Sequence, residues 1–567
     1  MEQKPLPIGI DNFEKLISRG YYFIDKTLLI KDILDNKADV NLFTRPRRFG
    51  KTLNMSMLQY YFEDRRDEFT GEKIDNSYLF DNLNIFKEKI EYLMHMGKYP
   101  VINLSLKSGK QPSFKMAYES LIDEIIKEYR RFNFILKNDK LLDSEKELFL
   151  DIMNGEAKES EYAKSLQFLS ICLEKYFSKK VIILIDEYDV PLENAFFEGF
   201  YDEMIAFIRA LFESALKTNS ALEFSVITGC LRISRESIFT GLNNLKIISI
   251  LDDRYAEHFG FTDKEVIKIC EDYNMMQKYE TIKAWFNGYI FGETKVYNPW
   301  SVMQYIDDLK ANINKLPKSY WANTSSNSIV KSLIERADDI TKGEIEALIE
   351  GKTIEKPVYE DITYGEVYDS LDNLWNFMFF TGYFKKISER MDEDTQQRFV
   401  KLAIPNLEVK YIFRTKILNW FNEKIKLCNM NKMFEAVINK NPEVFEIELN
   451  NLLLETISFN DAYENFYHGF LAGVLSSMKG YIVKSNREGG TGRSDLFIKS
   501  VSRRGVAIVL EFKIANDIDD LELKADEAIK QIEDRNYEAE LRSEGYKNIF
   551  KYGIAFYRKD CLIKIRL

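Results

Sequence analysis

The sequence predicts a multidomain α/β protein that begins with a parallel-sheet domain and ends with a smaller α/β domain. Strand-length apolar runs rich in β-branched residues occur at 40–44, 99–106, 179–187 and 222–229, and helix-like segments separate them. This alternation is typical of βαβ units on a buried parallel sheet. After residue 461 the expected order is helix, strand, strand, helix, strand, which predicts the second α/β domain.

Four parts are expected along the 567 residues, because a chain of this length is too long for a single hydrophobic core. The sheet domain would cover 1–260, and a mostly helical segment over 261–355 would form its lid. Residues 356–460 read as helices with a candidate hairpin within 382–406, an order that suits a helical, winged-helix-like middle region. The C-terminal α/β domain would cover 461–567.

The chain is acidic, with a formal net charge of −11, so its overall field does not attract nucleic acid. A nucleic-acid partner would have to be bound by a local basic patch or through metal ions. The five cysteines are scattered and form no C-x-x-C pair, which argues against a zinc site and favours a reducing cytoplasm. No apolar run approaches the roughly 18 residues that a membrane helix needs, so no membrane partner is expected.

The first candidate site is the stretch "TRPRRFGKT", which follows a predicted strand and opens a predicted helix. Gly50, Lys51 and Thr52 match the second half of a phosphate-binding loop, G-x-x-x-x-G-K-[ST], whereas Arg45 stands where the first glycine belongs. Backbone N–H groups at the helix start would hold phosphate oxygens, Lys51 would reach the β- and γ-phosphates, and the Thr52 hydroxyl would bind Mg²⁺.

A second half of the same site is expected at the end of the strand "VIILIDE". Burying two adjacent acids at the end of a strand costs free energy unless a metal compensates their charge. Asp186 would therefore hold Mg²⁺, and Glu187 would orient an attacking water. The alternative is that both acids lie in a surface loop. Thr228 ends the strand "FSVITG" and is a candidate sensor of the γ-phosphate.

Several arginines are candidates for contacts with phosphate. We expect Arg45, Arg47 or Arg48 to lie near phosphate, with a solvated loop as the alternative. Arg232 and Arg235, in "CLRISRESIF", are candidates for a charge-stabilising arginine acting in cis or from a neighbouring subunit, and structural salt bridges are an equal alternative for them. The sequence leaves open whether the chain forms a homo-oligomer.

The second candidate site lies in "GRSDLFIKSVSRRGVAIVLEFKI". Glu511 and Lys513 are two residues apart on one strand and project from the same face, and a hairpin would bring Asp495 beside Glu511. Two adjacent carboxylates favour a divalent cation, and oxygen ligands suit Mg²⁺ or Mn²⁺. Lys513 would then orient a water or stabilise charge at a scissile phosphate.

Neighbouring segments add candidates to this second site. Gln531 lies on the helix that follows, and Glu464 lies on the helix that precedes and is a further candidate metal ligand. His468 shares a helix face with Glu464, although a lone histidine on such a helix is more often structural. Basic residues cluster in sequence around the site and supply the local patch that an acidic chain needs: Lys484, Arg487, Arg493, Arg503, Arg504 and Lys513.

Two resemblances follow from these motifs. The segments "TRPRRFGKT", "IDEYD", "LRISRESIFTGLNNL", "WFNGYIFG" and "VYNPWSV", in this order within roughly residues 5 to 330, resemble the bacterial AAA-ATPase-like family, whose loop also lacks the first glycine. This resemblance implies an ATP-binding P-loop fold with a helical lid. Asp25, Lys26 and Thr27 match the family's N-terminal motif and are candidates to border the nucleotide.

The D…E-x-K pattern resembles the PD-(D/E)xK nuclease superfamily, in which Gln531 would match a recurring active-site glutamine. Residues 461–567 also resemble the restriction-endonuclease-like domain found behind this ATPase family. The resemblances imply a cytoplasmic bacterial protein that binds and hydrolyses ATP and carries a Mg²⁺-dependent nuclease acting on DNA in preference to RNA. Two rivals remain: an ATP-dependent switch or scaffold whose nuclease-like domain only binds, and an ATPase motor whose middle region engages DNA.

Overall fold

The computed structural model divides into two compact units, Met1–Leu333 with Thr353–Ile412, and Ile334–Lys352 with Phe413–Leu567. The predicted four-part division therefore remains a prediction. The structure describes residues 3–217, 219–231, 238–239, 243–321, 330, 333, 335–360, 364, 366–367, 369–416, 430–456, 464–476, 478–485 and 495–566.

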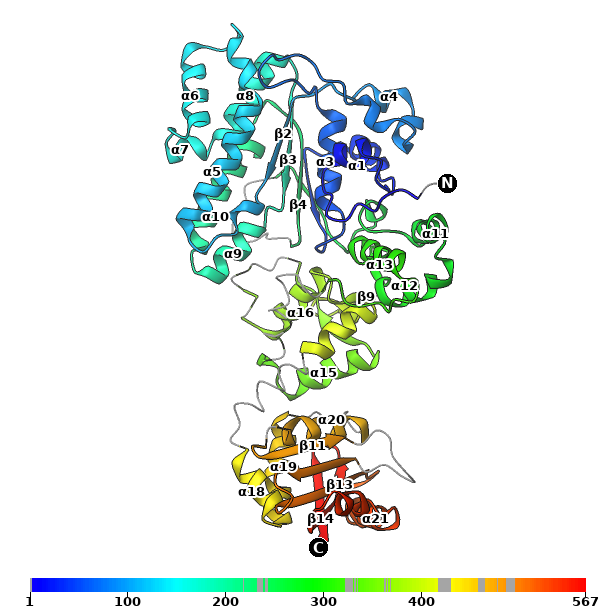
Figure 1. Cartoon of the computed structure of the whole chain (residues 1–567). Helices are drawn as coiled ribbons and strands as arrows, with labels where there is room; N and C mark the ends of the chain where they lie inside the picture. The colour runs from blue at the N-terminus through cyan, green and yellow to red at the C-terminus, as the bar shows by residue number, and fades with distance from the viewer. Residues whose placement is uncertain are drawn as a thin grey trace. The chain divides into compact units, whose positions relative to one another are not determined.

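The first unit is built on a five-stranded parallel sheet, as the sequence predicts (Figure 1). The strand order is β2-β3-β4-β1-β5, so β1 lies between β4 and β5 and its carboxyl end opens next to theirs. The strands are β1 (Val40–Thr44), β2 (Val101–Ser105), β3 (Val181–Asp186), β4 (Leu222–Gly229) and β5 (Leu245–Ile248). Because β1 and β3 are buried along their whole length, their polar loops emerge only at the sheet edge.

Helices cover both faces of this sheet, with α3 on one face and α5 and α8 on the other (Figure 1). The helices of this part are α1 (Phe13–Ser18), α2 (Leu28–Asn36), α3 (Lys51–Phe62), α4 (Ile90–Leu93), α5 (Phe114–Arg131), α6 (Asp143–Asn154), α7 (Glu159–Tyr162), α8 (Ser165–Phe177), α9 (Val190–Glu198) and α10 (Tyr201–Phe212).

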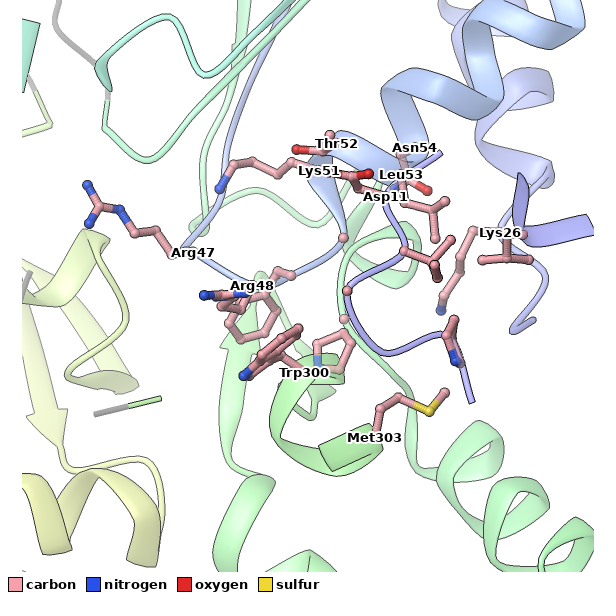
Figure 2. Close-up of a pocket in the computed structure, with 18 of the residues that line it drawn as sticks. Asp11, Lys26, Arg47, Arg48, Lys51, Thr52, Leu53, Asn54, Trp300 and Met303 are labelled. Carbon is pink, nitrogen blue, oxygen red and sulfur yellow. The ribbon is translucent and has the colours of Figure 1, made fainter. Parts of the chain in front are cut away.

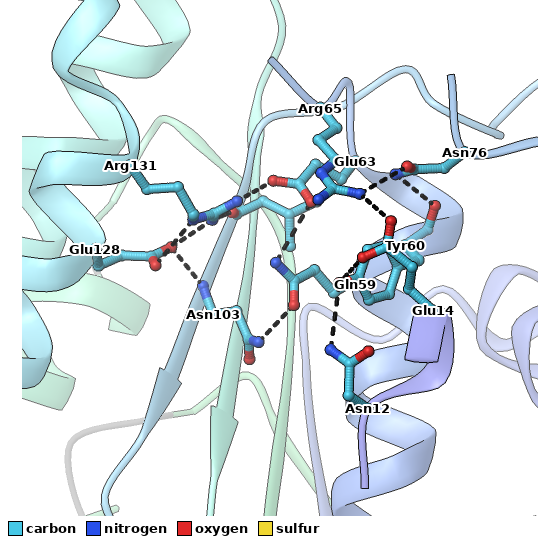
Figure 3. Close-up of polar contacts among 11 residues, drawn as sticks. Asn12, Glu14, Gln59, Tyr60, Glu63, Arg65, Asn76, Asn103, Glu128 and Arg131 are labelled. Atoms are coloured by element: carbon cyan, nitrogen blue, oxygen red, sulfur yellow. Dashed lines mark hydrogen bonds and ion pairs between the residues drawn. The ribbon is translucent and has the colours of Figure 1, made fainter. Parts of the chain in front are cut away.

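A buried polar network fixes the C-terminal half of α3 (Figure 3). Glu63, which caps the C-terminus of α3, forms an ion pair with Arg131 of α5, which also pairs with Glu128. Asn103 of β2 donates its backbone N–H to Glu128 at 2.8 Å and its side-chain amide to Gln59 at 2.7 Å. Since every charge is paired, the network holds α3, and with it the loop at its N-terminus, against the sheet.

The helical segment after the sheet contains α11 (Asp263–Asp272), α12 (Tyr279–Phe286) and α13 (Pro299–Ala311), with a small hairpin of β6 (Tyr289–Phe291) and β7 (Thr294–Val296) between the last two. The hairpin predicted within 382–406 is present as β9 (Lys385–Met391) and β10 (Arg398–Ala403). A third strand, β8 (Ile354–Pro357), pairs with β10, and α16 (Leu371–Phe380) precedes the hairpin.

The second unit ends in a mixed five-stranded sheet of order β11-β12-β13-β14-β15, in which only the β13–β14 pair is parallel. The sequence predicts the strands around Asp495 and Glu511 but misses β11, and it expects one strand after the helix where the structure has both β14 and β15. The elements are α15 (Asp339–Glu350), α18 (Asn431–Ile438), α19 (Pro442–Thr456), α20 (Glu464–Leu475), β11 (Tyr481–Ser485), β12 (Leu496–Ser500), β13 (Val506–Ile514), α21 (Leu521–Asp534), α22 (Glu538–Ser543), β14 (Asn548–Tyr557) and β15 (Asp560–Arg566).

Candidate active sites

A cavity of about 670 Å³ lies at the carboxyl end of the parallel sheet, where β1 continues through the loop 45–50 into α3 (Figure 2). Gly50, at φ 83°, and Arg48, at φ 73°, both take the left-handed conformation, which turns the chain sharply into the helix. Gly50, Lys51 and Thr52 line the cavity, and its volume is in the range of pockets that hold cofactors. The structure thus brings the predicted loop residues to one hollow.

Lys51 is almost completely buried inside this loop. Its ammonium donates to the carbonyl oxygens of Arg45 at 2.8 Å and Pro46 at 3.0 Å, and it lies 3.6 Å from the sulfur of Cys230. The ammonium is therefore held inside the loop by the carbonyls of Arg45 and Pro46. Together with the open N-terminus of a twelve-residue helix, this arrangement suits an anion.

Glu187 and Asp186 take different positions at the end of β3. Glu187 lines the cavity and has a positive φ of 54°, an uncommon backbone conformation for a side chain of this size. Burial raises the pKa of the Glu187 carboxyl, the charge of Asp186 raises it further, and Lys51 and Lys107 act against this rise. Asp186 is buried outside the cavity lining and accepts a hydrogen bond from the Thr228 hydroxyl of β4.

The three loop arginines have different surroundings (Figure 2). Arg48 is exposed, lines the cavity, and stacks its guanidinium 4.1 Å from the ring of Trp300 at the start of α13. Arg47 extends away from the other labelled cavity residues and forms an ion pair with Glu193 of α9. Both line the cavity, and Arg47 is in addition held by its ion pair with Glu193.

Arg45 is not where the sequence leads us to expect it. Its side chain is fully buried beneath the loop, donates to the carbonyls of Thr44 and Ile248, and lies about 5 Å from the rings of Phe259 (5.3 Å) and Phe291 (5.0 Å). It does not line the cavity. The expected phosphate contact is therefore corrected to a packing role, since the aromatic cage holds the guanidinium in place of the usual glycine turn.

We expect Arg45→Met to keep ATP affinity within about threefold of wild type, because methionine fills the same cage without the charge. Arg45→Gly restores the usual loop sequence but should lower stability by about 2–4 kcal/mol, because it empties a fully buried site. Thermal melts and ATP titrations of both variants check this. Loss of ATP binding in a stably folded Arg45→Met variant would instead show that Arg45 contacts phosphate.

The N-terminal motif Asp25–Lys26–Thr27 forms hydrogen bonds with distant parts of the chain beside the cavity. The Lys26 ammonium donates to the Glu257 carbonyl at 2.6 Å and to both oxygens of Glu265 at 2.7 Å. Asp25 accepts from the backbone N–H of Thr27 at 2.9 Å and of Asn84 at 2.6 Å. Lys26 lines the cavity, and these bonds position it there.

The second candidate site lies on the mixed sheet. Because Leu496 pairs with Leu510 across the β12–β13 ladder, Asp495 lies opposite the stretch that carries Glu511, and it accepts the backbone N–H of Phe512 at 2.7 Å. The Lys513 ammonium lies 3.5 Å from Oε1 of Glu511, and the Gln531 amide on α21 donates to the same oxygen. The predicted Asp495, Glu511, Lys513 and Gln531 thus come together.

Glu511 is 2% exposed, and its Oε2 atom has no hydrogen-bond partner among the described residues. Burial raises the pKa of Glu511 to about 8, with the Asp495 charge as the next contribution and Lys513 opposing both. A buried carboxylate with an open oxygen beside a second carboxylate fits a divalent cation, which would compensate the buried charge. Asp495 and Glu511 are the side chains that would hold it.

Other predicted residues fall outside what the structure describes. Arg232, Arg235, Arg487 and Arg493 lie outside the described residues, and of Glu464 and His468 only the backbone within α20 is described. In the described part of the chain, no group of three or more His, Cys, Asp or Glu side chains is arranged to hold a metal. No helix in the described ranges is both long and apolar enough to cross a bilayer.

Sequence reasoning missed Lys107 and Lys110, which line the first cavity from the turn η3 (Lys107–Gly109) after β2. The available signal was their position directly after a predicted strand, at the sheet edge where the phosphate loop was also expected.

Comparison with known proteins finds one family match around each candidate site. Residues 7–239 match a family model described as "Predicted AAA-ATPase", and residues 462–565 match one described as "PD-(D/E)XK nuclease superfamily". A protein of Azotobacter chroococcum mcd 1, described as an uncharacterized protein in the vnfD 5′ region, is 24% identical over 577 residues, covering 98% of this chain and 97% of its own. Residues 7–239 are therefore a domain of the predicted AAA-ATPase family, and residues 462–565 are a domain of the PD-(D/E)XK nuclease superfamily.

Proposed function

We propose that this protein binds and hydrolyses ATP in its first unit and cleaves nucleic-acid phosphodiester bonds with Mg²⁺ in its C-terminal domain. The observation that carries the nuclease proposal is the buried Glu511 carboxylate, which has one open oxygen and lies among Asp495, Lys513 and Gln531. The family matches support ATPase and nuclease-like roles in general. DNA is the proposed substrate in preference to RNA, Mn²⁺ is a proposed substitute for Mg²⁺ at the nuclease site, and the proposed location is the cytoplasm.

At the first site, Lys51 would bind the β- and γ-phosphates, and Thr52 and Asp186 would hold Mg²⁺. Glu187 would orient the attacking water, and Thr228 would sense the γ-phosphate through its hydrogen bond to Asp186. Arg48 would bind phosphate from the exposed side of the loop. Arg232 and Arg235 remain proposed as charge-stabilising arginines, from this chain or from a second copy in a homo-oligomer.

At the second site, Asp495 and Glu511 would hold the cation, with Glu464 as a third acid. Lys513 would orient the water and stabilise charge on the scissile phosphate. Gln531 would act as a positioning residue, because its amide fixes the Glu511 oxygen. The bound cation would offset the negative charge of the two carboxylates, which would otherwise repel a phosphodiester.

The phosphate loop also contacts the part of the predicted middle region that belongs to the first compact unit, Thr353–Ile412. Arg47, Glu193 and Cys230 line one small buried cavity with Tyr364, Phe377 and Thr381. Gly382, at φ 94°, lies so close to the loop that an added Cβ would be 2.9 Å from Cβ of Pro46. A change in the conformation of the loop on nucleotide binding would therefore act directly on the turn between α16 and β9.

Gly382→Ala should weaken ATP binding by about fivefold or more, because the new methyl group displaces Pro46. Gly351→Ala is the matched control, since Gly351 has nearly the same φ of 95° and open space around its Cβ position. Both variants carry the same backbone strain of about 1 kcal/mol, so any difference in ATP titration reports the Pro46 contact. Equal ATP affinities of the two variants would argue against the coupling.

The functional test is cleavage of plasmid and single-stranded DNA and of RNA with Mg²⁺ or Mn²⁺, with and without ATP. Metal-dependent cutting supports the nuclease. If wild type binds ATP and nucleic acid but cuts nothing under any condition, the switch or scaffold is favoured. The motor is less favoured, because Arg390 and Arg398 of the hairpin are held in ion pairs with Glu355, Glu389 and Glu360.

A further inference from the structure

Two lysines reach the first cavity from a strand that carries no phosphate-loop motif. The turn η3 follows β2, and both Lys107 and Lys110 line the same cavity as Lys51, Thr52 and Glu187. In the sheet, β2 is separated from β1 by β3 and β4, so these lysines approach the cavity from the β3 side. They add two positive charges to a hollow that already holds Lys51 and Arg48.

The turn that carries the lysines is held rigidly. The N–H of Leu106 donates to the carbonyl of Asp186 at 3.0 Å, which joins the turn to the end of β3. Gly109 is buried, and an added Cβ would lie 2.8 Å from Cβ of Pro191 on α9 and 3.2 Å from Leu121 on α5. The turn is therefore clamped between two helices, and Lys107 starts one residue beyond the bond to Asp186.

The two ammonium groups have carboxylates nearby but no direct partner. Neither the Lys107 nor the Lys110 side chain makes a hydrogen bond or ion pair with a residue that the structure describes, whereas Lys26 and Arg47 in the same lining are bonded to carboxylates. At longer range, the charge of Lys107 opposes the rise that burial causes in the pKa of Glu187, and Lys110 does the same for the pKa of Glu193. Unpaired cations that converge on a cavity attract a polyanion and raise its local concentration. The charge they could match is the terminal phosphate, which distinguishes a nucleoside triphosphate from a diphosphate.

We propose that Lys107, assisted by Lys110, binds the terminal phosphate of the nucleotide and makes the site prefer a nucleoside triphosphate over a diphosphate. This inference rests on the proposed ATP site. Lys107 is the principal residue, because it directly follows Leu106, whose N–H is bonded to Asp186. Lys110 is three residues further along the chain and has the smaller role.

The test is a calorimetric titration of the full chain with MgATP and with MgADP. Lys107→Ala should weaken ATP binding by about tenfold or more and ADP binding by less than about threefold, because a charged hydrogen bond to the terminal phosphate is lost. Lys110→Ala should show the same selectivity with a smaller loss, and Lys107→Arg should restore most of the preference. Lys115→Ala is the control, since Lys115 is exposed on α5 and does not line the cavity.

The outcomes separate this inference from the ATP site itself. If wild type prefers ATP and Lys107→Ala leaves the ratio of ATP to ADP affinity unchanged, the role of Lys107 is overturned while the ATP site stands. If wild type binds neither nucleotide, both proposals fail. A selective loss of ATP affinity in Lys107→Ala, absent from Lys115→Ala, supports the inference.

Discussion

Glu511→Gln is expected to abolish metal-dependent cleavage, lowering the rate by about 10²–10³-fold, while the protein folds normally. The substitution keeps the size of the side chain and removes one of the two carboxylates that would hold the cation. Electrostatic stabilisation by a bound metal supplies several kcal/mol to such a reaction, and each 1.36 kcal/mol is a factor of ten in rate. Cleavage assays with Mg²⁺ and Mn²⁺ measure the loss directly.

The same variant should be at least as stable as wild type when divalent cations are absent. Glu511 is buried, its Oε2 has no partner among the described residues, and Asp495 adds a like charge nearby. A neutral amide removes the free energy needed to bury that charge. In the absence of nucleotide, adding Mn²⁺ should raise the melting temperature of wild type and leave that of Glu511→Gln nearly unchanged.

Glu544→Gln is the matched control for Glu511→Gln. It makes the same chemical change in the same domain, but Glu544 is paired with Lys499 at 2.7 Å and belongs to neither candidate site. It should keep wild-type cleavage and lose a little stability. Cleavage by Glu511→Gln at the wild-type rate would rule out Glu511 as a metal ligand.

The sequence predicts the strands that are buried along much of their length, and it misses some that depend on their neighbours. β1 and β4 coincide with predicted apolar runs because continuous β-branched segments have few alternatives to a buried strand. β5 is mostly half-buried and forms through its pairing with β1, and β11 is half-buried or exposed at residues 481–484 and pairs with β12. Such partly exposed strands owe their existence to tertiary contacts that local patterns do not contain.

The candidate sites show the same division. Lys51, Thr52 and Glu187 could be predicted because each follows a strand whose carboxyl end lies at the same sheet edge. The position of Arg45 could not, because its cage is made by Phe259 and Phe291, more than 200 residues further along the chain. A sequence motif predicts where the backbone turns, but the position of a long side chain depends on how residues distant in the sequence pack around it.

Lys51→Ala is expected to raise the dissociation constant of ATP by about 100-fold or more. The Lys51 ammonium is held by the carbonyls of Arg45 and Pro46 at the start of α3, so it is already positioned for phosphate oxygens. Each charge-assisted hydrogen bond contributes about 1.5–3 kcal/mol, and losing one or two accounts for a change of this size. Calorimetric titration with MgATP measures it.

A loss of folding must be separated from a loss of binding in this experiment. Removing the ammonium also leaves two loop carbonyls without their donor, which can cost about 1–3 kcal/mol of stability. Lys51→Met keeps the apolar stem, so its melting temperature should be closer to that of wild type than the melting temperature of Lys51→Ala. Its loss of ATP affinity should be as large as that of Lys51→Ala. If Lys51→Met binds ATP like wild type, the loop is not the phosphate site.

The response of the nuclease to Lys51→Met then tests whether ATP bound at this loop alters cleavage. The loop residues Pro46 and Arg47 contact Gly382 and Tyr364 within one compact unit, so the phosphate site and the middle region share an interface that can change together. If ATP alters cleavage by wild type, Lys51→Met should cut at the ATP-free rate whatever the ATP concentration. An ATP response that survives in this variant would mean that ATP acts elsewhere, because a ligand shifts only the states that it binds unequally.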